Sequence, residues 1–253
     1  MPHTVVLIRH AQALHNDWNI HDPSLSSLGL EQCQELREDL LQRFGDETDA
    51  LIIVSPMRRT IQTALLSLDW LIEKGVRIQA DARWQGTNDR VEDENSAKPC
   101  DTGSSVDGLK AEFAKVDFSA VDPVYPDKTS PRGSKYAFTK EAILDRARSG
   151  VQDIREHKEK LILVVSHSGF LRLGVTGHWF FNGDYRVFEL DECNEPDQPP
   201  KLKQLEATLN GGLGKSWPDP VVIGSDLPIP DAPPQGESHS QDTTSFTSDN
   251  RLL

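Results

Sequence analysis

The chain begins with a short apolar run that ends in two polar residues, Val5-Val6-Leu7-Ile8-Arg9-His10. Successive β-branched and aliphatic residues are typical of a buried strand in a parallel sheet. Ligands of open α/β sheets bind at the carboxyl ends of the strands, where Arg9 and His10 stand here. A guanidinium at that edge can bind a phosphate group through its planar fork, and a neutral imidazole can attack phosphorus.

Two further apolar runs also end in polar turns. Ala50–Val54 is followed by Ser55-Pro56 and then Arg59, and Leu161–Val165 is followed by Ser166-His167. If the three strands are neighbours in one parallel sheet, two histidines and two arginines meet at a single edge. Phosphoryl transfer requires a nucleophile in line with the leaving group and fixed positive donors around the phosphoryl oxygens.

Helical patterns alternate with these strands, which predicts an α/β fold, a three-layer α/β/α sandwich around a mainly parallel sheet. The expected helices run from Ser26-Ser27 to about residue 44, from about 59 to 71, and from the capping Thr139 to about 156. Residues 84–134 are polar and irregular, with one short helix expected at 106–113. A last strand is expected at 185–190.

The composition changes after about residue 195, where Pro, Ser, Asp, Gly and Gln replace core-forming residues. Chains of that composition do not bury enough apolar surface to fold. We therefore expect one catalytic domain over residues 1–195 and an extended or disordered tail over residues 196–253.

The charge of the chain limits its partners. Its 253 residues carry 27 Lys and Arg against 40 Asp and Glu, a net charge of −13, which argues against nucleic acid or an anionic membrane as partner. No apolar stretch approaches the ~20 residues of a membrane helix, and the N-terminus lacks a signal-peptide pattern. The three cysteines (Cys33, Cys100 and Cys193) lie far apart and form no Cys-x-x-Cys pair. We expect free thiols and a cytoplasmic location.

Taken together, the motifs resemble those of the histidine phosphatase superfamily, the group that includes the phosphoglycerate mutases. The resemblance spans residues 5 to about 190 and rests on four motifs: Arg9-His10-Ala11 with Asn16, Leu25-Ser26-Ser27-Leu28-Gly29-Leu30-Glu31-Gln32, Ser55-Pro56-Met57-Arg58-Arg59-Thr60-Ile61-Gln62-Thr63-Ala64, and Ser166-His167-Ser168-Gly169. A fungal and plant subgroup is also similar in two segments, Pro99-Cys100-Asp101-Thr102-Gly103-Ser104 and Asn182-Gly183-Asp184-Tyr185-Arg186.

The resemblance implies a role for each residue of these motifs. His10 would be the nucleophile and would carry the phosphohistidine. Arg9, Arg59 and His167 would bind the phosphoryl group and stabilise its charge in the transition state. Asn16 would make a further contact in the phosphate pocket. No metal or other cofactor would be needed, because these side chains supply the positive field.

The chain departs from the family pattern at three positions. Ala11 and Ser168 replace the glycines that usually follow the two histidines, and Ser168 would add a hydroxyl donor to the phosphate pocket. Relatives also carry a glutamate as general acid in a Leu-x-Glu context shortly after a strand that is expected here near Val76–Ile78. Here the matching residues are Trp84-Gln85-Gly86, so a glycine occupies that position. Asp89 is the nearest carboxylate and the candidate replacement.

Less specific interpretations stand beside these. His3, His15 and His21 could form a metal cluster with His10, but their spacing fits no common zinc pattern. Cys100 could be a nucleophile, although a buried structural thiol is the commoner role of such a residue. Arg58 is expected on the helix surface, since only one of two adjacent helical positions can face a pocket.

The sequence thus predicts a metal-independent phosphatase that hydrolyses a small phosphorylated substrate through a phosphohistidine at His10. The missing glutamate motivates an alternative, a catalytically impaired or repurposed phosphate-binding protein. A phosphomutase is a third possibility, since mutases share the same pocket and differ in excluding water.

Overall fold

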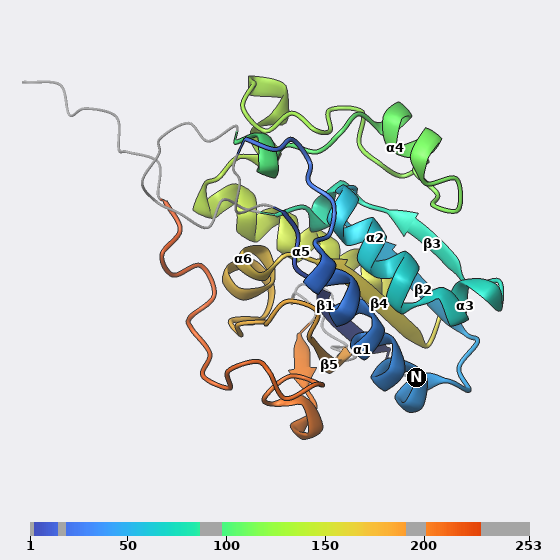
Figure 1. The fold of residues 1–253 in the computed structure, drawn as a ribbon. Helices are drawn as coiled ribbons and strands as arrows, with labels where there is room; N and C mark the ends of the chain where they lie inside the picture. Colours follow the sequence, from blue (N-terminus) through green and yellow to red (C-terminus); the bar gives the residue numbers. More distant parts are fainter. Residues whose placement is uncertain (1–2, 15–18, 87–97, 191–200, 229–253) are drawn as a thin grey trace, which may run out of the picture.

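A six-stranded sheet with the order β3-β2-β4-β1-β5-β6 forms the centre of the computed structural model (Figure 1). The structure describes residues 3–14, 19–86, 98–190 and 201–228. Strands β1 to β4 run parallel, β5 pairs antiparallel with β1, and β6 pairs antiparallel with β5. The sheet is therefore mainly parallel, as the alternation of strands and helices predicts.

The elements follow the predicted order along the described chain. The strands are β1 (Thr4–Arg9), β2 (Ala50–Val54), β3 (Arg77–Ala80), β4 (Leu161–Ser166), β5 (Tyr185–Leu190) and β6 (Leu202–Gln204). The α-helices are α1 (Ser27–Phe44), α2 (Arg58–Ser67), α3 (Asp69–Glu73), α4 (Val106–Glu112), α5 (Lys140–Glu156) and α6 (Ser168–Phe170). Short helical turns span Ala82–Trp84, Pro99–Asp101, Pro131–Tyr136, Leu171–Thr176 and Glu206–Thr208.

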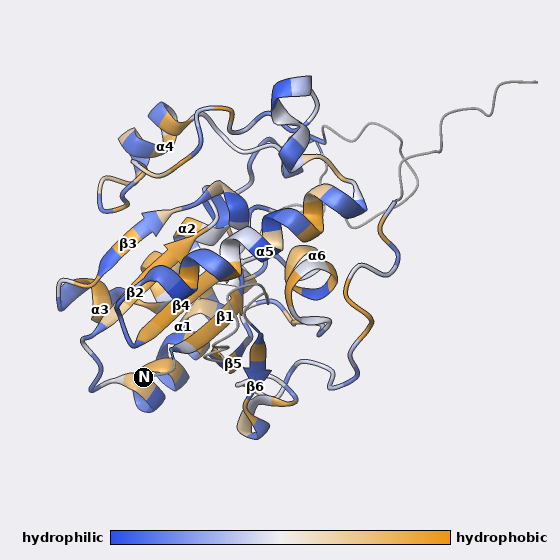
Figure 2. Cartoon of the chain, turned by 180° about the vertical axis from the view of Figure 1, so that it is seen from behind, coloured by the Kyte–Doolittle hydropathy of each residue, from blue (hydrophilic) through white to orange (hydrophobic). Residues whose placement is uncertain are grey.

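Alternating residues of the central strands fill two cores, one on each face of the sheet. On one face Val6 and Ile8 of β1 pack with apolar residues of α1 to α4. On the other face Val5 and Leu7 pack with residues of α5 and α6. Figure 2 shows the apolar sheet between helices whose outward faces are polar. Two helical layers around one sheet confirm the predicted three-layer sandwich.

The two long helices begin at the predicted capping residues. Ser26 Oγ accepts a hydrogen bond from the backbone N–H of Gly29 at 3.1 Å, and Thr139 Oγ1 accepts one from Ala142 at 3.3 Å. Such caps satisfy N–H groups that have no partner within the helix. The predicted helix over 59–71 is two helices, α2 and α3, which meet at Leu68.

The folded part of the chain continues beyond residue 195. Strand β6 completes the sheet, and two fully buried charged residues of the β5 region hold the segment after it. Asp184 accepts hydrogen bonds from the backbone N–H groups of Leu213 and Lys215 and from Ser216 Oγ. The Pro- and Gly-rich composition predicted a tail here. The buried carboxylate of Asp184 fixes the segment by accepting hydrogen bonds from its N–H groups, and composition does not reveal such contacts.

Arg186 also fixes this segment, by donating hydrogen bonds to backbone carbonyl oxygens. Its guanidinium donates to Thr208, Leu209, Trp179 and Trp217, which ties residues 208–217 to the loop before β5. Residues 201–228 thus differ from the expected tail, whereas 229–253 lie outside the described residues. No helix within the described ranges is long and apolar enough to span a membrane.

Candidate active site

Three parallel strands bring the predicted site residues to one edge of the sheet. Strand β4 lies between β1 and β2, and each strand is followed directly by a polar residue: His10, Ser55 and His167. The backbone N–H of His10 donates to Ser166 O at 3.0 Å, which keeps the register past the end of β1. The two imidazole rings consequently lie edge to face, with their centroids 5.0 Å apart.

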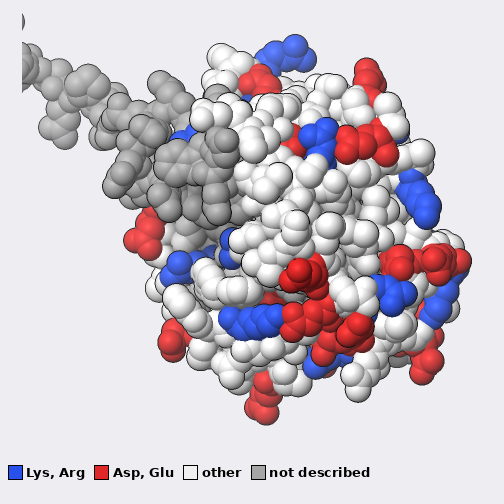
Figure 3. Space-filling model, viewed as in Figure 1, with Lys and Arg blue, Asp and Glu red and all other residues white. Residues whose placement is uncertain are grey.

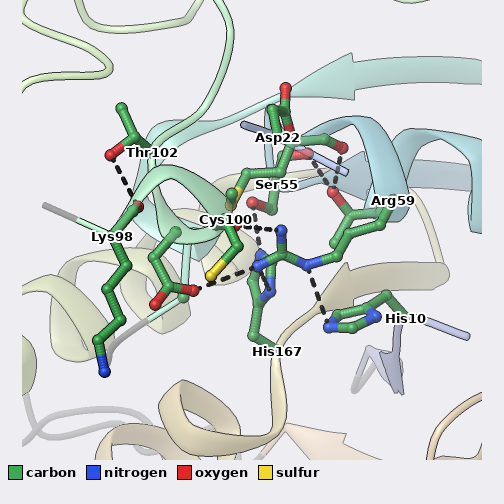
Figure 4. Close-up of polar contacts among 12 residues, drawn as sticks. His10, Asp22, Ser55, Arg59, Lys98, Cys100, Thr102 and His167 are labelled. Atoms are coloured by element: carbon green, nitrogen blue, oxygen red, sulfur yellow. Dashed lines mark hydrogen bonds and ion pairs between the residues drawn. The ribbon is translucent and has the colours of Figure 1, made fainter. Parts of the chain in front are cut away.

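The guanidinium of Arg59 lies between the two histidines (Figure 4). It is 4 % exposed and comes from the first turn of α2, which begins just after Ser55-Pro56. Its Nε lies 3.3 Å from Nε2 of His10, and its Nη2 lies 3.3 Å from Nδ1 of His167. Arg59 therefore places a fixed positive charge against both rings.

The hydrogen bonds of His10 define its tautomer. Nδ1 lies 2.7 Å from the carbonyl oxygen of Ala11, and a carbonyl can only accept, so Nδ1 carries a proton. Nε2 accepts from Arg59, so it carries a lone pair and no proton. The ring is neutral, with the nitrogen that a nucleophile requires turned toward the guanidinium.

His167 is neutral as well, with its proton on the other nitrogen. Its Nδ1 accepts from Arg59, and Nε2 lies 3.0 Å from Ser55 Oγ, which accepts the N–H. Burial lowers the pKa of His167 well below 6.5, and the nearby charge of Arg59 lowers it further. Ser55 belongs to the second motif but was not among the predicted site residues. Its place at the end of β2 was the available signal.

The Pro99–Asp101 turn closes another side of the pocket. Arg59 Nη1 donates to the carbonyl oxygen of Cys100 at 2.9 Å, and Asp101 Oδ1 lies 3.8 Å from Arg59 Nη2. The turn is held by Asp22, whose buried carboxylate accepts from the backbone N–H groups of Arg58 and Ser104, both at 2.9 Å. One carboxylate thus joins the start of α2 to the loop that contacts Arg59.

The Cys100 side chain is a buried free thiol, as is that of Cys33. Burial and the Asp101 charge raise the pKa of Cys100, whereas a nucleophilic thiol requires a lowered one. Its contribution to the site is the backbone carbonyl. Cys193 lies outside the described residues.

Arg9 and Ser168 lie on the side of the pocket formed by the 179–181 segment. Arg9 Nη1 donates to the carbonyl oxygen of Phe180 at 2.8 Å, and its Cζ lies 6.0 Å from the ring centroid of Trp179. Ser168 Oγ donates to the same carbonyl oxygen at 3.3 Å. Both residues are near the histidines in sequence, but these contacts are to the protein backbone and an aromatic ring. Their phosphate-binding roles remain predictions.

Gly86, the position to which the resemblance assigns the acid, lies directly against the site. A Cβ atom there would be 3.1 Å from His167 Cγ and 3.3 Å from His167 Nδ1. A side chain at position 86 would therefore face His167. The predicted replacement Asp89 lies outside the described residues, as does Asn16.

Lys128 was not among the predicted site residues, and it reaches the same place from the loop before Pro131–Tyr136. Its Nζ donates to the carbonyl oxygen of Asp101 at 2.9 Å and of Gly86 at 3.4 Å. Burial of the ammonium group lowers the pKa of Lys128 to about 7, and the charge of Arg146 adds to this effect. Lys128 is one of four lysines in the irregular polar region 84–134, and no spacing distinguishes it from the others.

The structure also locates Arg58 and His3, the residues for which other roles were considered. Arg58 points away from Arg59 and contacts Glu112 and the carbonyl oxygen of Asp22, as the surface prediction requires. His3 stands before β1, at the opposite edge of the sheet, with Nδ1 2.8 Å from Glu159 O. Within the described part of the chain, no three His, Cys, Asp or Glu side chains are grouped to hold a metal ion.

The outer surface contrasts with this basic pocket. Figure 3 shows Lys and Arg side chains scattered among Asp and Glu on the face viewed, without a continuous basic patch on that face. The net charge of −13 leads us to expect this pattern. An anionic ligand would be attracted only where Arg59 and its neighbours concentrate positive charge.

Comparison with known proteins agrees with this geometry. The model of the Histidine phosphatase superfamily (branch 1) matches residues 5–98. A protein of Schizosaccharomyces pombe named a probable phosphatase is 30% identical over 179 residues, which are 67% of this chain and 76% of the relative. An Arabidopsis thaliana phosphoglycerate mutase-like protein is 33% identical over 205 residues, covering 66% of this chain and 72% of the relative.

One solved structure shares the fold at lower identity. It is an Escherichia coli protein described as a candidate alpha-ribazole-5'-P phosphatase, with a TM-score of 0.50 and 20% identity. The match covers 80% of this chain and 96% of that one. With the motifs, the strand order and these relatives in agreement, the chain belongs to the histidine phosphatase superfamily.

Proposed function

We propose that this protein is a phosphatase that hydrolyses a small phosphate monoester through a phosphohistidine at His10. The observation that carries the proposal is the tautomer of His10: Nδ1–H is held by the Ala11 carbonyl, and the lone pair of Nε2 faces Arg59. A nucleophile and a positive donor are thus directed at the same space. The phosphatase name of the fungal relative supports the same reaction class.

In the first step the lone pair of His10 Nε2 forms a bond to phosphorus, and the bond to the leaving-group oxygen breaks. Arg59 stabilises the negative charge on the phosphoryl oxygens, and His167 would turn its Nε2–H from Ser55 Oγ to donate to one of them. In the second step water attacks the phosphohistidine, phosphate leaves, and His10 regains its lone pair. Side chains provide all the positive charge in this scheme, so we expect activity without a metal ion.

A phosphate-binding protein without turnover is the second candidate, and Gly86 is the observation that favours it. A pocket that binds phosphate but lacks a proton donor would release an alkoxide slowly. Such a protein would bind inorganic phosphate through Arg59 and hydrolyse no ester.

The decisive experiment is incubation with a ³²P-labelled aryl phosphate in the presence of a chelator, followed by detection of acid-labile, base-stable phosphate on the protein. We expect labelling of wild type and loss of both label and turnover, by about a thousandfold or more, in His10→Ala. His157→Ala is the matched control, because His157 ends α5 at the opposite edge of the sheet, beside Asp153. Undiminished turnover in His10→Ala would overturn the mechanism, and phosphate binding without label would favour the binding protein.

A further inference from the structure

The pocket has a nucleophile and a phosphate clamp, but position 86 provides no carboxyl group to protonate the leaving group. The side chain of another residue lies beside Gly86, however: Nζ of Lys128 is 3.4 Å from the Gly86 carbonyl oxygen. The same Gly86 lies against the ring of His167. The ammonium group of Lys128 is therefore beside the position that the glutamate of relatives would fill.

The loop that contains Lys128 is held in place by its own hydrogen bonds. Asp127 Oδ1 accepts from the backbone N–H groups of Thr129 at 3.0 Å and Ser130 at 2.9 Å, which closes a turn around Lys128. Nζ itself is anchored on the carbonyl oxygen of Asp101 at 2.9 Å. The lysine thus bridges the two segments that border the pocket, the one ending at Gly86 and the Pro99–Asp101 turn.

We propose that Lys128 is the proton donor of this enzyme and replaces the absent glutamate. The inference rests on the proposed function. As His10 Nε2 bonds to phosphorus, the electron pair of the breaking P–O bond goes to the leaving oxygen, which takes a proton from Lys128 Nζ. The neutral amine then accepts a proton from the attacking water. The P–N bond breaks with its electron pair returning to His10, so the cycle ends with alcohol, phosphate and the ammonium form of Lys128.

The charges around Lys128 suit both halves of this cycle. Burial of Nζ, with Arg146 of α5 and Arg59 of α2, favours the neutral amine, whereas Asp101 and Asp22 favour the ammonium ion. The balance sets the pKa at about 7. A group with a pKa near the working pH can both donate and accept a proton, which is the requirement for an acid that must become a base.

Among the described residues, Asp101 is the competing candidate, since its carboxylate also borders the pocket. Its Oδ1 pairs with Arg59 Nη2 at 3.8 Å, which assigns it to holding the arginine. Loss of Asp101 should then affect all substrates alike. Loss of the true proton donor should affect esters according to the basicity of their leaving group, and this difference separates the two residues.

The test compares two esters, 2,4-dinitrophenyl phosphate, whose leaving group needs no proton, and phenyl phosphate, whose leaving group does. For Lys128→Met we expect kcat/KM for phenyl phosphate to fall by about 10²-fold or more, and to fall at least tenfold further than for the dinitrophenyl ester. Lys128→Arg keeps the charge but does not release a proton near neutral pH, so it should show the same selective loss. Phosphohistidine formed from the dinitrophenyl ester reports that each variant is folded.

The pH dependence of kcat/KM provides a second test of the donor role. Donation requires the ammonium form, so the kcat/KM of wild type for phenyl phosphate should decline as the pH rises through about 7. This decline should be absent from Lys128→Met and much weaker in wild type with the dinitrophenyl ester.

Each contrary outcome has a distinct meaning. Equal losses for the two esters, or full activity of Lys128→Arg on phenyl phosphate, would overturn the donor role while the phosphohistidine mechanism stands. A leaving-group effect in Asp101→Asn but not in Lys128→Met would assign the role to Asp101. Wild type that forms no phosphohistidine even from the dinitrophenyl ester would overturn the proposed function, and the donor role with it.

Discussion

Arg59 and His10 meet through a contact in which Nε of the guanidinium lies 3.3 Å from Nε2 of the imidazole. The arginine thereby occupies the space in front of the nucleophilic nitrogen. An incoming phosphoryl group would exchange this contact for ones between its oxygens and the guanidinium, so the same side chain keeps the ring neutral and stabilises charge in the transition state.

Replacing Arg59 should therefore impair catalysis strongly. We expect Arg59→Met to lower kcat by about 10²–10³-fold on an aryl phosphate. Arg59→Lys should recover only part of this loss, because a single ammonium cannot reach both histidines at once. Arg58→Met is the control: it is adjacent in sequence but contacts Glu112, and it should retain wild-type kinetics. Similar kinetics for the Arg58 and Arg59 variants would contradict this account of the pocket.

Gly86→Ala should disturb His167. Its Cβ would lie 3.1 Å from His167 Cγ, so the ring must shift by a few tenths of an ångström and weaken the contact with Arg59. We expect roughly tenfold weaker binding of inorganic phosphate by calorimetry and a comparable fall in kcat/KM. Gly108→Ala, in the short helix α4, should leave both unchanged. Unaltered phosphate binding in Gly86→Ala would show that the ring position is not critical.

The low pKa of His167 should appear in the pH dependence of stability. The unfolded chain takes up a proton near pH 6.5 at this residue, while the folded protein does not. The unfolded state therefore binds more protons below that pH, and the free energy of unfolding should fall on acidification, by up to about 1.4 kcal/mol per pH unit. Urea midpoints at pH 7.0 and 5.5 should differ less in His167→Gln than in wild type. His157→Gln should keep the wild-type difference, and equal differences in all three proteins would refute the assignment.

Asp184→Asn should loosen the segment that follows β6. The amide cannot accept from all of the donors that now share the carboxylate, among them Leu213 N–H and Ser216 Oγ. Leaving buried donors unpaired costs about 1–3 kcal/mol each, so we expect at least that loss in the free energy of unfolding and faster tryptic cleavage after Lys215. Asp145→Asn, an exposed carboxylate paired with Arg148, should change stability by less than about 0.5 kcal/mol.

Much of the fold, and the positions of the two site histidines, follow from local sequence patterns. The strand over Ala50–Val54 has the predicted bounds, and Thr139 caps the predicted helix. The reason is physical: a buried parallel strand needs a continuous apolar run, and a helix start needs a side-chain acceptor. His10 and His167 could be assigned to one edge because the carboxyl ends of parallel strands meet there.

The boundary at residue 195 shows where composition is a poor guide. Residues 201–228 lie in the expected tail, yet they are fixed because Asp184 and Arg186 bind their backbone groups and because leucines of this segment pack against the two cores. Hydrogen bonds to backbone leave no trace in the composition of the segment that makes them.

Local sequence patterns predicted the parallel part of the sheet, the edge at which its polar turns meet, and the two histidines and Arg59 at that edge, because each depends on a few consecutive residues. The groups that fix the tautomer of His10, and the position of Lys128 beside Gly86, emerge only from the folded structure. Both depend on contacts between segments, because Arg59 reaches His10 Nε2 from 49 residues away and Lys128 reaches Gly86 from 42 residues away. No local pattern records which guanidinium or ammonium group long-range packing will bring to a site.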